Sequence, residues 1–191
     1  MKANLTVFAV CVALFAVLSN GCDRLKEKRE IKAASVSVIL PAHEFPFTLS
    51  PSSVTPKSTF GANDEITLYD GVVNWDYEKE LRDKGIDPNI LKEINIKELK
   101  FEIKKPKGLD LTPMQNIRVY AGKDYKLVAQ GRAAGIDAVG LNVLQKDLLS
   151  ILREKAFNLK VTNNGIIPQA PEQLEAVIYV KAEAVIEAYS K

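Results

Sequence analysis

Strict alternation of apolar and polar residues marks three segments of the chain. Residues 99–104 (LKFEIK), 117–121 (IRVYA) and 157–162 (FNLKVT) each carry an apolar residue at every second position. A period of two places one face of a β-strand against a core and the other face in water. We therefore predict a half-buried strand for each of these segments.

The longest alternating segment is residues 174–188. Its even positions hold Leu, Ala, Ile, Val, Ala, Ala, Ile and Ala, and its charged residues stand at odd positions. Ala and Glu are also good helix formers, and the apolar residues from Ala182 to Tyr189 have a spacing that suits a helix. The alternation favours one long strand, with a helix over the last ten residues as the alternative.

Shorter apolar runs between turn-forming residues predict the remaining strands. Residues 122–124 (GKD) separate two such runs and predict a hairpin turn. The further strands are predicted at residues 34–40, 45–49, 65–74, 125–130 and 137–143.

Three short segments have helical signals. Asp76 can cap a helix over residues 77–84, an Asp-Pro pair opens a second over residues 89–94, and leucines at helical spacing predict a third over residues 145–154. These helices are too few to cover both faces of a parallel sheet. The predicted fold is therefore mainly β, an antiparallel β-sandwich of immunoglobulin-like or jelly-roll-like type with two or three short helices.

The first 22 residues carry a pattern of a different kind. Lys2 provides a positive start, residues 5–18 are apolar apart from one threonine, and small residues lead into Cys22. A membrane-spanning helix needs about 20 apolar residues, and this run is shorter. The pattern predicts a secretory signal that is removed from the mature protein.

The end of this leader, Leu18-Ser-Asn-Gly-Cys22, resembles the lipobox of bacterial lipoproteins. The resemblance implies that Cys22 is diacylated on sulfur and becomes the mature N-terminus once the signal peptide, residues 1–21, is cleaved. Gly21 and Cys22 fit the lipobox, whereas Ser19 stands where most lipoboxes have leucine. An ordinary secretory leader with a chance cysteine is the alternative.

Residues 22–31 are nearly all charged, with mixed signs, and predict a flexible tether. Ten extended residues reach about 30 Å, enough to lift a domain clear of lipid headgroups. Residues 32–191 are predicted to form a single β-sandwich domain. Asp23 resembles the signal that retains lipoproteins in the inner membrane of enteric-type bacteria, a rule that other lineages do not follow. The expected location is the bacterial envelope, at either membrane.

Charge and cysteine content narrow the classes of partner. The chain has 26 Lys and Arg against 24 Asp and Glu, so it lacks the basic footprint of a protein that binds nucleic acid. Its two cysteines are Cys11, in the leader, and Cys22. The mature domain therefore has no thiol that could form a disulfide in an oxidising compartment.

The body of the chain carries a second resemblance. The run ELKFEIKKPKGLDLTPMQNIRVYAGKDYKLVAQ, followed by a short amphipathic helix and FNLKV, is similar to uncharacterised bacterial envelope lipoproteins predicted to be β-sandwiches. This resemblance covers about the last hundred residues and rests on the pattern of strands and helix, not on a diagnostic motif. It implies the fold and the anchor, and it brings no catalytic residue.

Candidate chemistry is sparse. His43 is the only histidine, so a zinc site with several histidines is excluded. The predicted domain after Cys22 also has no cysteine that could act with His43 in a metal or catalytic site. Asp64, Glu65, Asp70 and Asp76 form the densest carboxylate group, but without the spacing of a calcium loop they are predicted to be solvated charges.

Aromatic residues offer two further candidates. Tyr69, Trp75 and Tyr77 could form a sugar-binding platform, although a core role for Trp75 is favoured in a sandwich of this size. The proline-spaced segment 41–60 could be a recognition loop that presents aromatic residues. These aromatic residues are Phe45, Phe47 and Phe60. Phe45 and Phe47 stand at alternating positions, which favours their burial in the core.

These observations predict a membrane-anchored envelope lipoprotein that acts as a non-catalytic binding or structural module. The expected partners are the membrane, through the acyl chains on Cys22, and another envelope protein or a glycan. No cofactor, metal or catalytic residue is assigned. The alternatives are a carboxylate-dependent, glycan-directed hydrolase and a carrier of lipids or other apolar ligands.

Overall fold

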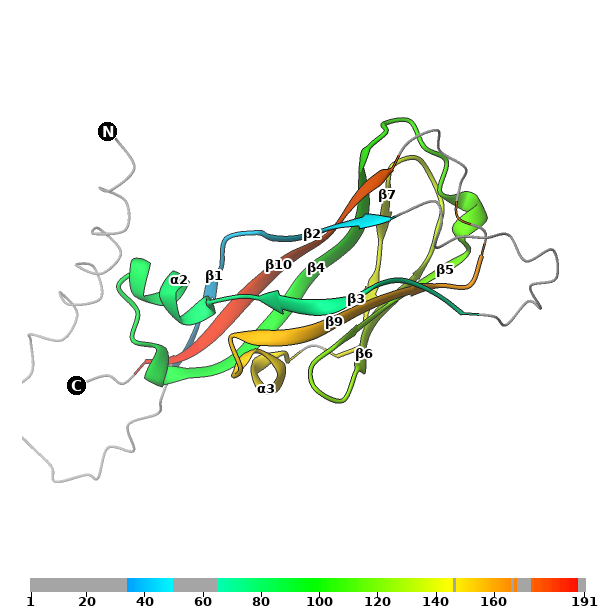
Figure 1. Cartoon of the computed structure of the whole chain (residues 1–191). Helices are drawn as coiled ribbons and strands as arrows, with labels where there is room; N and C mark the ends of the chain where they lie inside the picture. Colours follow the sequence, from blue (N-terminus) through cyan, green and yellow to red (C-terminus); the bar gives the residue numbers. More distant parts are fainter. Residues whose placement is uncertain (1–33, 50–64, 146, 166, 168–172, 189–191) are drawn as a thin grey trace, which may run out of the picture. The chain divides into compact units, whose positions relative to one another are not determined.

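The computed structural model describes residues 34–49, 65–145, 147–165, 167 and 173–188 (Figure 1), all within the compact unit 33–191. The predicted leader, the tether and Cys22 lie outside the described residues. The described elements, in chain order, are β1 (Ala34–Ile39), β2 (His43–Leu49), β3 (Ile66–Asn74), α2 (Tyr77–Asp83), the 3-10 helix η2 (Pro88–Ile90), β4 (Leu91–Lys105), the 3-10 helix η3 (Thr112–Met114), β5 (Asn116–Ala121), β6 (Lys126–Arg132), β7 (Ala138–Gly140), β8 (Asn142–Val143), α3 (Leu149–Leu152), β9 (Ala156–Asn163) and β10 (Leu174–Ala188).

The first sheet, sheet A, is built on the two longest strands, β4 and β10. These strands pair antiparallel over most of their length, and β7 pairs with the other side of β4. Both β1 and β2 pair with the free side of β10, β1 along its C-terminal part and β2 along its N-terminal part. Together they form one edge strand, interrupted next to Pro41, where a proline interferes least with the ladder.

The second sheet, sheet B, has the strand order β3-β9-β5-β6-β8, and all its pairs are antiparallel. The predicted hairpin between β5 and β6 is confirmed. Gly122 begins the turn with φ +85°, and Tyr125 ends it in the same left-handed region with φ +48°. This conformation suits glycine and is uncommon for tyrosine.

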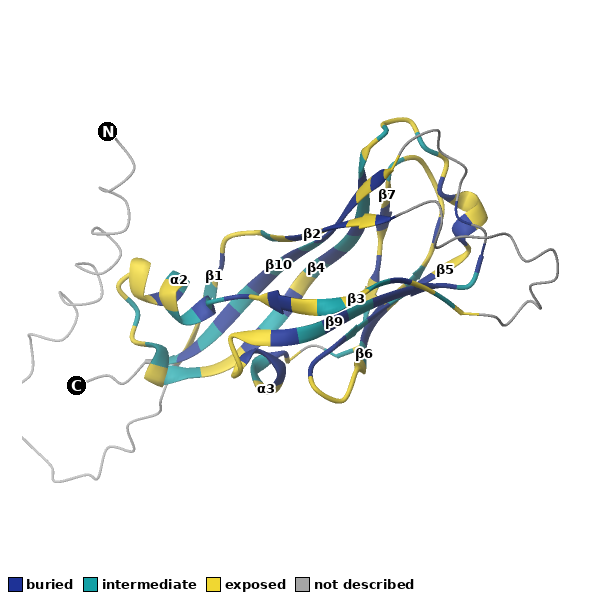
Figure 2. Cartoon of the chain, viewed as in Figure 1, coloured by how far each residue is buried: buried dark blue, intermediate teal, exposed yellow. Residues whose placement is uncertain are grey.

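Sheets A and B enclose one apolar core. Along β4, β9 and β10 buried positions alternate with more exposed ones, as predicted (Figure 2). Phe45 on β2 packs edge-on against Phe157 on β9, with ring centroids 5.9 Å apart, so the core connects the two sheets. Phe101, Ile178 and Val161 are fully buried within it. The antiparallel β-sandwich is therefore confirmed.

Of the first two predicted helices, one is confirmed and one is wrong. The helix after Asp76 is confirmed as α2, and the Asp76 side chain accepts a hydrogen bond from the Lys79 backbone N–H at 3.0 Å. The helix at residues 89–94 is wrong, because only Pro88–Ile90 form a 3-10 turn and β4 begins at Leu91. Pairing with β10 extends β4 to that point, and it outweighs the local Asp-Pro signal.

A second predicted helix and one predicted strand also differ from the structure. The helix at residues 145–154 shortens to Leu149–Leu152, because Leu148 N–H donates to the Ile94 carbonyl and ties the preceding residues to β4. The single strand at residues 137–143 is wrong as well. It is split between β7 in sheet A and β8 in sheet B, so the chain changes sheets between Gly140 and Asn142.

None of the described helices has the length and hydropathy needed to cross a membrane.

Candidate functional site

The described members of the carboxylate group predicted from the sequence do not converge. Asp64 lies outside the described residues, Asp76 caps α2, and Glu65 and Asp70 bind different neighbours in sheet B. Within the described ranges no group of three or more His, Cys, Asp or Glu residues could hold a metal ion.

The aromatic candidates are mostly core residues. Trp75 is 1% exposed, and Tyr77, Phe45 and Phe47 are also buried. The interpretation of Trp75, Phe45 and Phe47 as core residues is confirmed, whereas Phe60 lies outside the described residues. A sugar-binding platform built on Trp75 and Tyr77 is excluded by their burial.

The only histidine lies beside the only tryptophan. The rings of His43, at the start of β2, and Trp75 stack with centroids 5.3 Å apart and planes 16° from parallel. Trp75 Nε1 donates to Glu80 Oε1 at 3.0 Å, and His43 Nδ1 lies 3.9 Å from the same oxygen. The three side chains form a cluster between β2 and α2.

Glu80 has an unsatisfied carboxylate oxygen in this cluster. Its Oε2 is buried with no hydrogen-bond partner among the described residues. Burial raises the pKa of the carboxyl, and the Trp75 hydrogen bond and nearby His43 offset only part of this effect. A general acid must present its proton to a substrate. A buried Oε2 cannot do so, which argues against a hydrolase centred on Glu80.

We expect Glu80→Gln to raise the Tm at pH 8 by about 2–4 °C, the shift that about 1 kcal/mol produces in a chain of this size. An acid whose pKa is raised by folding costs stability above that pKa and none once it is protonated. The gain should therefore shrink as the pH falls towards 4. Thermal unfolding of both proteins across this pH range measures it.

The matched control is Glu78→Gln on the same helix. Glu78 is more exposed and pairs with Arg82 and Lys155. Its neutralisation should give no stabilisation at pH 8, so an equal gain in both variants would contradict the assignment to burial.

The outer face of sheet A carries lysines paired with glutamates. Lys97 Nζ lies 2.7 Å from Glu183, and Lys105 Nζ lies 3.1 Å from Glu175. Four more lysines of this sheet and the loop after it make similar pairs; they are Lys92, Lys100, Lys104 and Lys107. Exposed pairs of this kind add little stability. They neutralise the face and leave few groups for a ligand.

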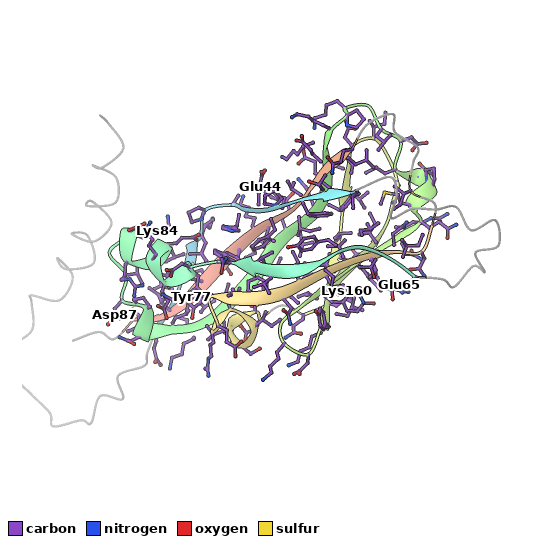
Figure 3. The ribbon with its side chains drawn as sticks, in the orientation of Figure 1. Glu44, Glu65, Tyr77, Lys84, Asp87 and Lys160 are labelled. Atoms are coloured by element: carbon purple, nitrogen blue, oxygen red, sulfur yellow. The ribbon has the colours of Figure 1, made fainter. Side chains whose placement is uncertain are left out.

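The outer face of sheet B is different in composition. By strand register Asp70, Lys160 and Tyr120 form one row across β3, β9 and β5. Figure 3 shows Lys160 and Glu65 along the β3 and β9 pair. The side chains that we call the sheet B face are Glu65, Asp70, Arg118, Tyr120, Tyr125 and Lys160.

Glu65 anchors one side of this face. Its Oε1 accepts hydrogen bonds from Tyr120 OH at 3.0 Å, from Arg118 Nη1 at 3.3 Å and from Thr162 Oγ1. Partial burial opposes ionisation of Glu65, but these three hydrogen bonds outweigh it and lower the pKa of the carboxyl. The network fixes the Tyr120 ring and the Arg118 guanidinium in place.

Tyr125 anchors the other side. It reaches from the β5–β6 turn to β3, where its OH donates to Asp70 Oδ1 at 2.9 Å. Lys160 Nζ lies 6.0 Å from the centre of the Tyr125 ring. Tyr125 is 39% exposed, and its backbone is in the left-handed region. The Asp70 hydrogen bond therefore holds an exposed aromatic ring in a defined position.

Comparisons with known proteins add no family. No protein-family model and no curated protein match the chain. A structure of infectious bursal disease virus, Gx strain, matches at 12% identity with a TM-score of 0.24, over 88% of this chain and 37% of that chain. The crystal structure of the VP2 subviral particle of the same virus matches at 10% identity with a TM-score of 0.26, over 87% and 38%. The chain thus spans little more than a third of those chains, and the fold assignment rests on the sheets described above.

The sheet B face has the chemistry of a polar binding surface. It combines aromatic rings with a guanidinium, an ammonium and carboxylates, which offer both stacking surface and directional hydrogen bonds. Sequence reasoning named Glu65 and Asp70 but missed Arg118, Tyr120, Tyr125 and Lys160. A signal was present at Tyr120, an aromatic residue in the outward phase of an alternating strand.

An apolar cavity of about 30 Å³ lies between the described parts of the two sheets. Its lining comes from both sheets and from α3, and includes Phe45, Trp75, Ile151 and Phe157. The cavity is too small for an acyl chain.

Proposed function

We propose that the chain is a bacterial envelope lipoprotein, anchored through Cys22, whose sandwich is a non-catalytic binding module for a saccharide. The binding surface is the sheet B face. The observation that carries the proposal is the pair of outward tyrosines, Tyr120 and Tyr125, each held by a hydrogen bond from its hydroxyl to a carboxylate.

The chemistry of a sugar ring matches this arrangement. A pyranose has an apolar face of C–H groups that can stack on an aromatic ring, and hydroxyls that pair with carboxylates and guanidinium groups. The exposed ring of Tyr125 provides the stacking surface. Lys160 Nζ lies 6.0 Å from the centre of this ring, and Arg118 is held by Glu65 elsewhere on the same face, so both cations can pair with sugar hydroxyls. Rings that are already held in position lose little conformational entropy on binding.

Two observations weigh against the alternatives. A lipid carrier needs an apolar cavity that holds an acyl chain, and the cavity between the described parts of the two sheets measures only about 30 Å³. A glycosidase needs a carboxylic acid with a raised pKa beside its partner. On the sheet B face, hydrogen bonds lower the pKa of Glu65.

The test is saccharide binding by the purified full chain in detergent. Titration with cello-oligosaccharides, polygalacturonate and peptidoglycan fragments gives the affinity for each. We expect Tyr125→Ala to weaken binding of the saccharide that wild type takes by at least about ten-fold, because it removes the ring and the Asp70 hydrogen bond.

Tyr179→Ala is the matched control, because Tyr179 lies on sheet A beside Lys100. It should leave binding unchanged. Equal losses in the two variants, or no saccharide bound by wild type, would overturn the proposal. Release of reducing ends during the titration would favour the hydrolase instead.

A further inference from the structure

The edge strand β1 lacks the features that keep a sheet edge from pairing with another chain. Its sequence, ASVSVI, has no charge, proline or glycine, and its pairing with β10 continues without a register shift. Val36 is 43% exposed and Ile39 is 60% exposed. An uncharged edge strand that exposes β-branched apolar residues is a template for the addition of another strand.

The other edge strands of the described sheets are protected. On sheet A, β2 carries Glu44 and Pro46, whereas on sheet B, β3 carries Asp70 and a register shift between Thr67 and Tyr69. The remaining edge strands, β7 and β8, are only three and two residues long. Charge, proline, an irregular ladder and short length all hinder edge-to-edge pairing. Among the described strands, β1 is therefore the edge that is open to it.

The free side of β1 presents a regular row of backbone groups. Leu40 N–H donates to the Ala182 carbonyl at 3.0 Å, and the direction of the backbone groups alternates along a strand. The even-numbered residues of β1 therefore direct their N–H and C=O groups at β10. Ser35, Ser37 and Ile39 direct theirs away from it, and within the described ranges no other backbone group pairs with these three.

We propose that β1 pairs antiparallel with β1 of a second copy of this chain, so that sheet A continues through a symmetric dimer. A two-fold axis beside Ser37 places this residue opposite Ser37 of the second copy, and Val36 opposite Val38 of that copy. Such an isologous interface requires a strand that matches itself. Here serine meets serine, valine meets valine, and no like charges face each other.

The pairing also covers exposed apolar surface. Val36 and Val38 have Ile186 and Ala184 of β10 as register partners, and both of these residues are buried. The two valines therefore lie on the core side of sheet A, and the second copy extends this apolar layer past the edge. One added strand is a small interface, so we expect a reversible dimer with a Kd of about 1–100 µM.

The first test is sedimentation of the purified full chain in detergent over a range of concentrations. Ser37→Lys and Ser37→Glu should each weaken dimerisation at least about ten-fold, because each places like charges opposite one another across the axis. An equimolar mixture of the two variants should restore the dimer, because lysine then faces glutamate. Thr48→Lys is the matched control, an exposed position on the edge strand β2 of the same sheet, and should dimerise as wild type does.

The second test is a disulfide across the axis. Residues opposite each other in a hydrogen-bonded antiparallel pair have Cα atoms about 5.5 Å apart, within the range of a disulfide. Ser37→Cys should therefore cross-link to its own copy under mild oxidation, above the background that the cysteines of wild type give. Ser35→Cys is the control, because Ser35 faces Ile39 of the second copy and the two Ser35 residues are offset by about 13 Å along the strands.

Three results would overturn the proposal. Wild type that sediments as a monomer at every concentration would exclude the dimer. Equal weakening by Ser37→Lys and Thr48→Lys, with no recovery in the mixture, would attribute the loss to added charge and not to contact at Ser37. A dimer that cross-links equally at residues 35 and 37, or at neither, would place the interface away from this register of β1.

Discussion

Replacement of Cys22 by serine is expected to abolish acylation completely and to leave residues 1–21 attached. Serine has no thiol for the diacyl group, so lipoprotein signal peptidase has no substrate. A single acyl chain holds a protein at a membrane only marginally, whereas two chains hold it stably. Intact mass and metabolic labelling with a fatty acid measure both effects: wild type should begin at Cys22 and carry the acyl mass.

Cys11→Ser is the matched control for this experiment. It removes the other cysteine of the chain, within the predicted leader, and should give a product identical to the wild-type mature protein. A wild-type protein without acyl mass at its N-terminus would show that the leader is an ordinary secretory signal. The sandwich and its binding face would then act in a soluble protein.

The strands were predictable because alternation is a local property that burial enforces. Residues 117–121, 157–162 and 174–188 alternate in the sequence, and all three lie within strands of the structure. The alternative helix at the C-terminus lost because β10 pairs on both sides, with β4 and with β1 and β2. These ladders satisfy its backbone and bury its even positions from Leu174 to Ile186.

The failed helices show where local signals stop being sufficient. The Asp87 side chain does accept from the Asn89 backbone N–H at 2.9 Å, as a helix cap would. It starts only a 3-10 turn, because Ile94 and Ile96 must face the core opposite Ala184 and Ala182 of β10. A partner about ninety residues away decides the conformation, and no local motif indicates it.

The assembly of the sheet B face depends on strand order in the same way. Alternation places Arg118 and Tyr120 on one side of their strand and Lys160 on one side of its own. It does not say that the two strands are neighbours, or that β3 brings Asp70 into the same row. The reach of Tyr125 across to Asp70 needs the hairpin geometry as well. The composition of the face could therefore be listed in part from the sequence, but its assembly could not.

The core should be most sensitive at Phe101, where we expect alanine to lower the free energy of unfolding by about 3–5 kcal/mol. Phe101 is fully buried, pairs with Ile178 of β10 and Val139 of β7, and lies 6.2 Å from the Phe47 ring. Its removal leaves a cavity where three strands meet, and rigid sheets cannot collapse to fill it.

Urea unfolding of the purified full chain, followed by Trp75 fluorescence, measures this loss. A domain of ordinary stability has about 5–15 kcal/mol in total, so Phe101→Ala should unfold at a clearly lower urea concentration with an unchanged slope. Val72→Ala is the control, because Val72 is 63% exposed on β3 and its truncation creates no cavity. Its midpoint should stay close to that of wild type. Equal midpoints for all three proteins would mean that Phe101 is not packed between the sheets, and the inter-sheet core on which the sheet B face is mounted would have to be drawn differently.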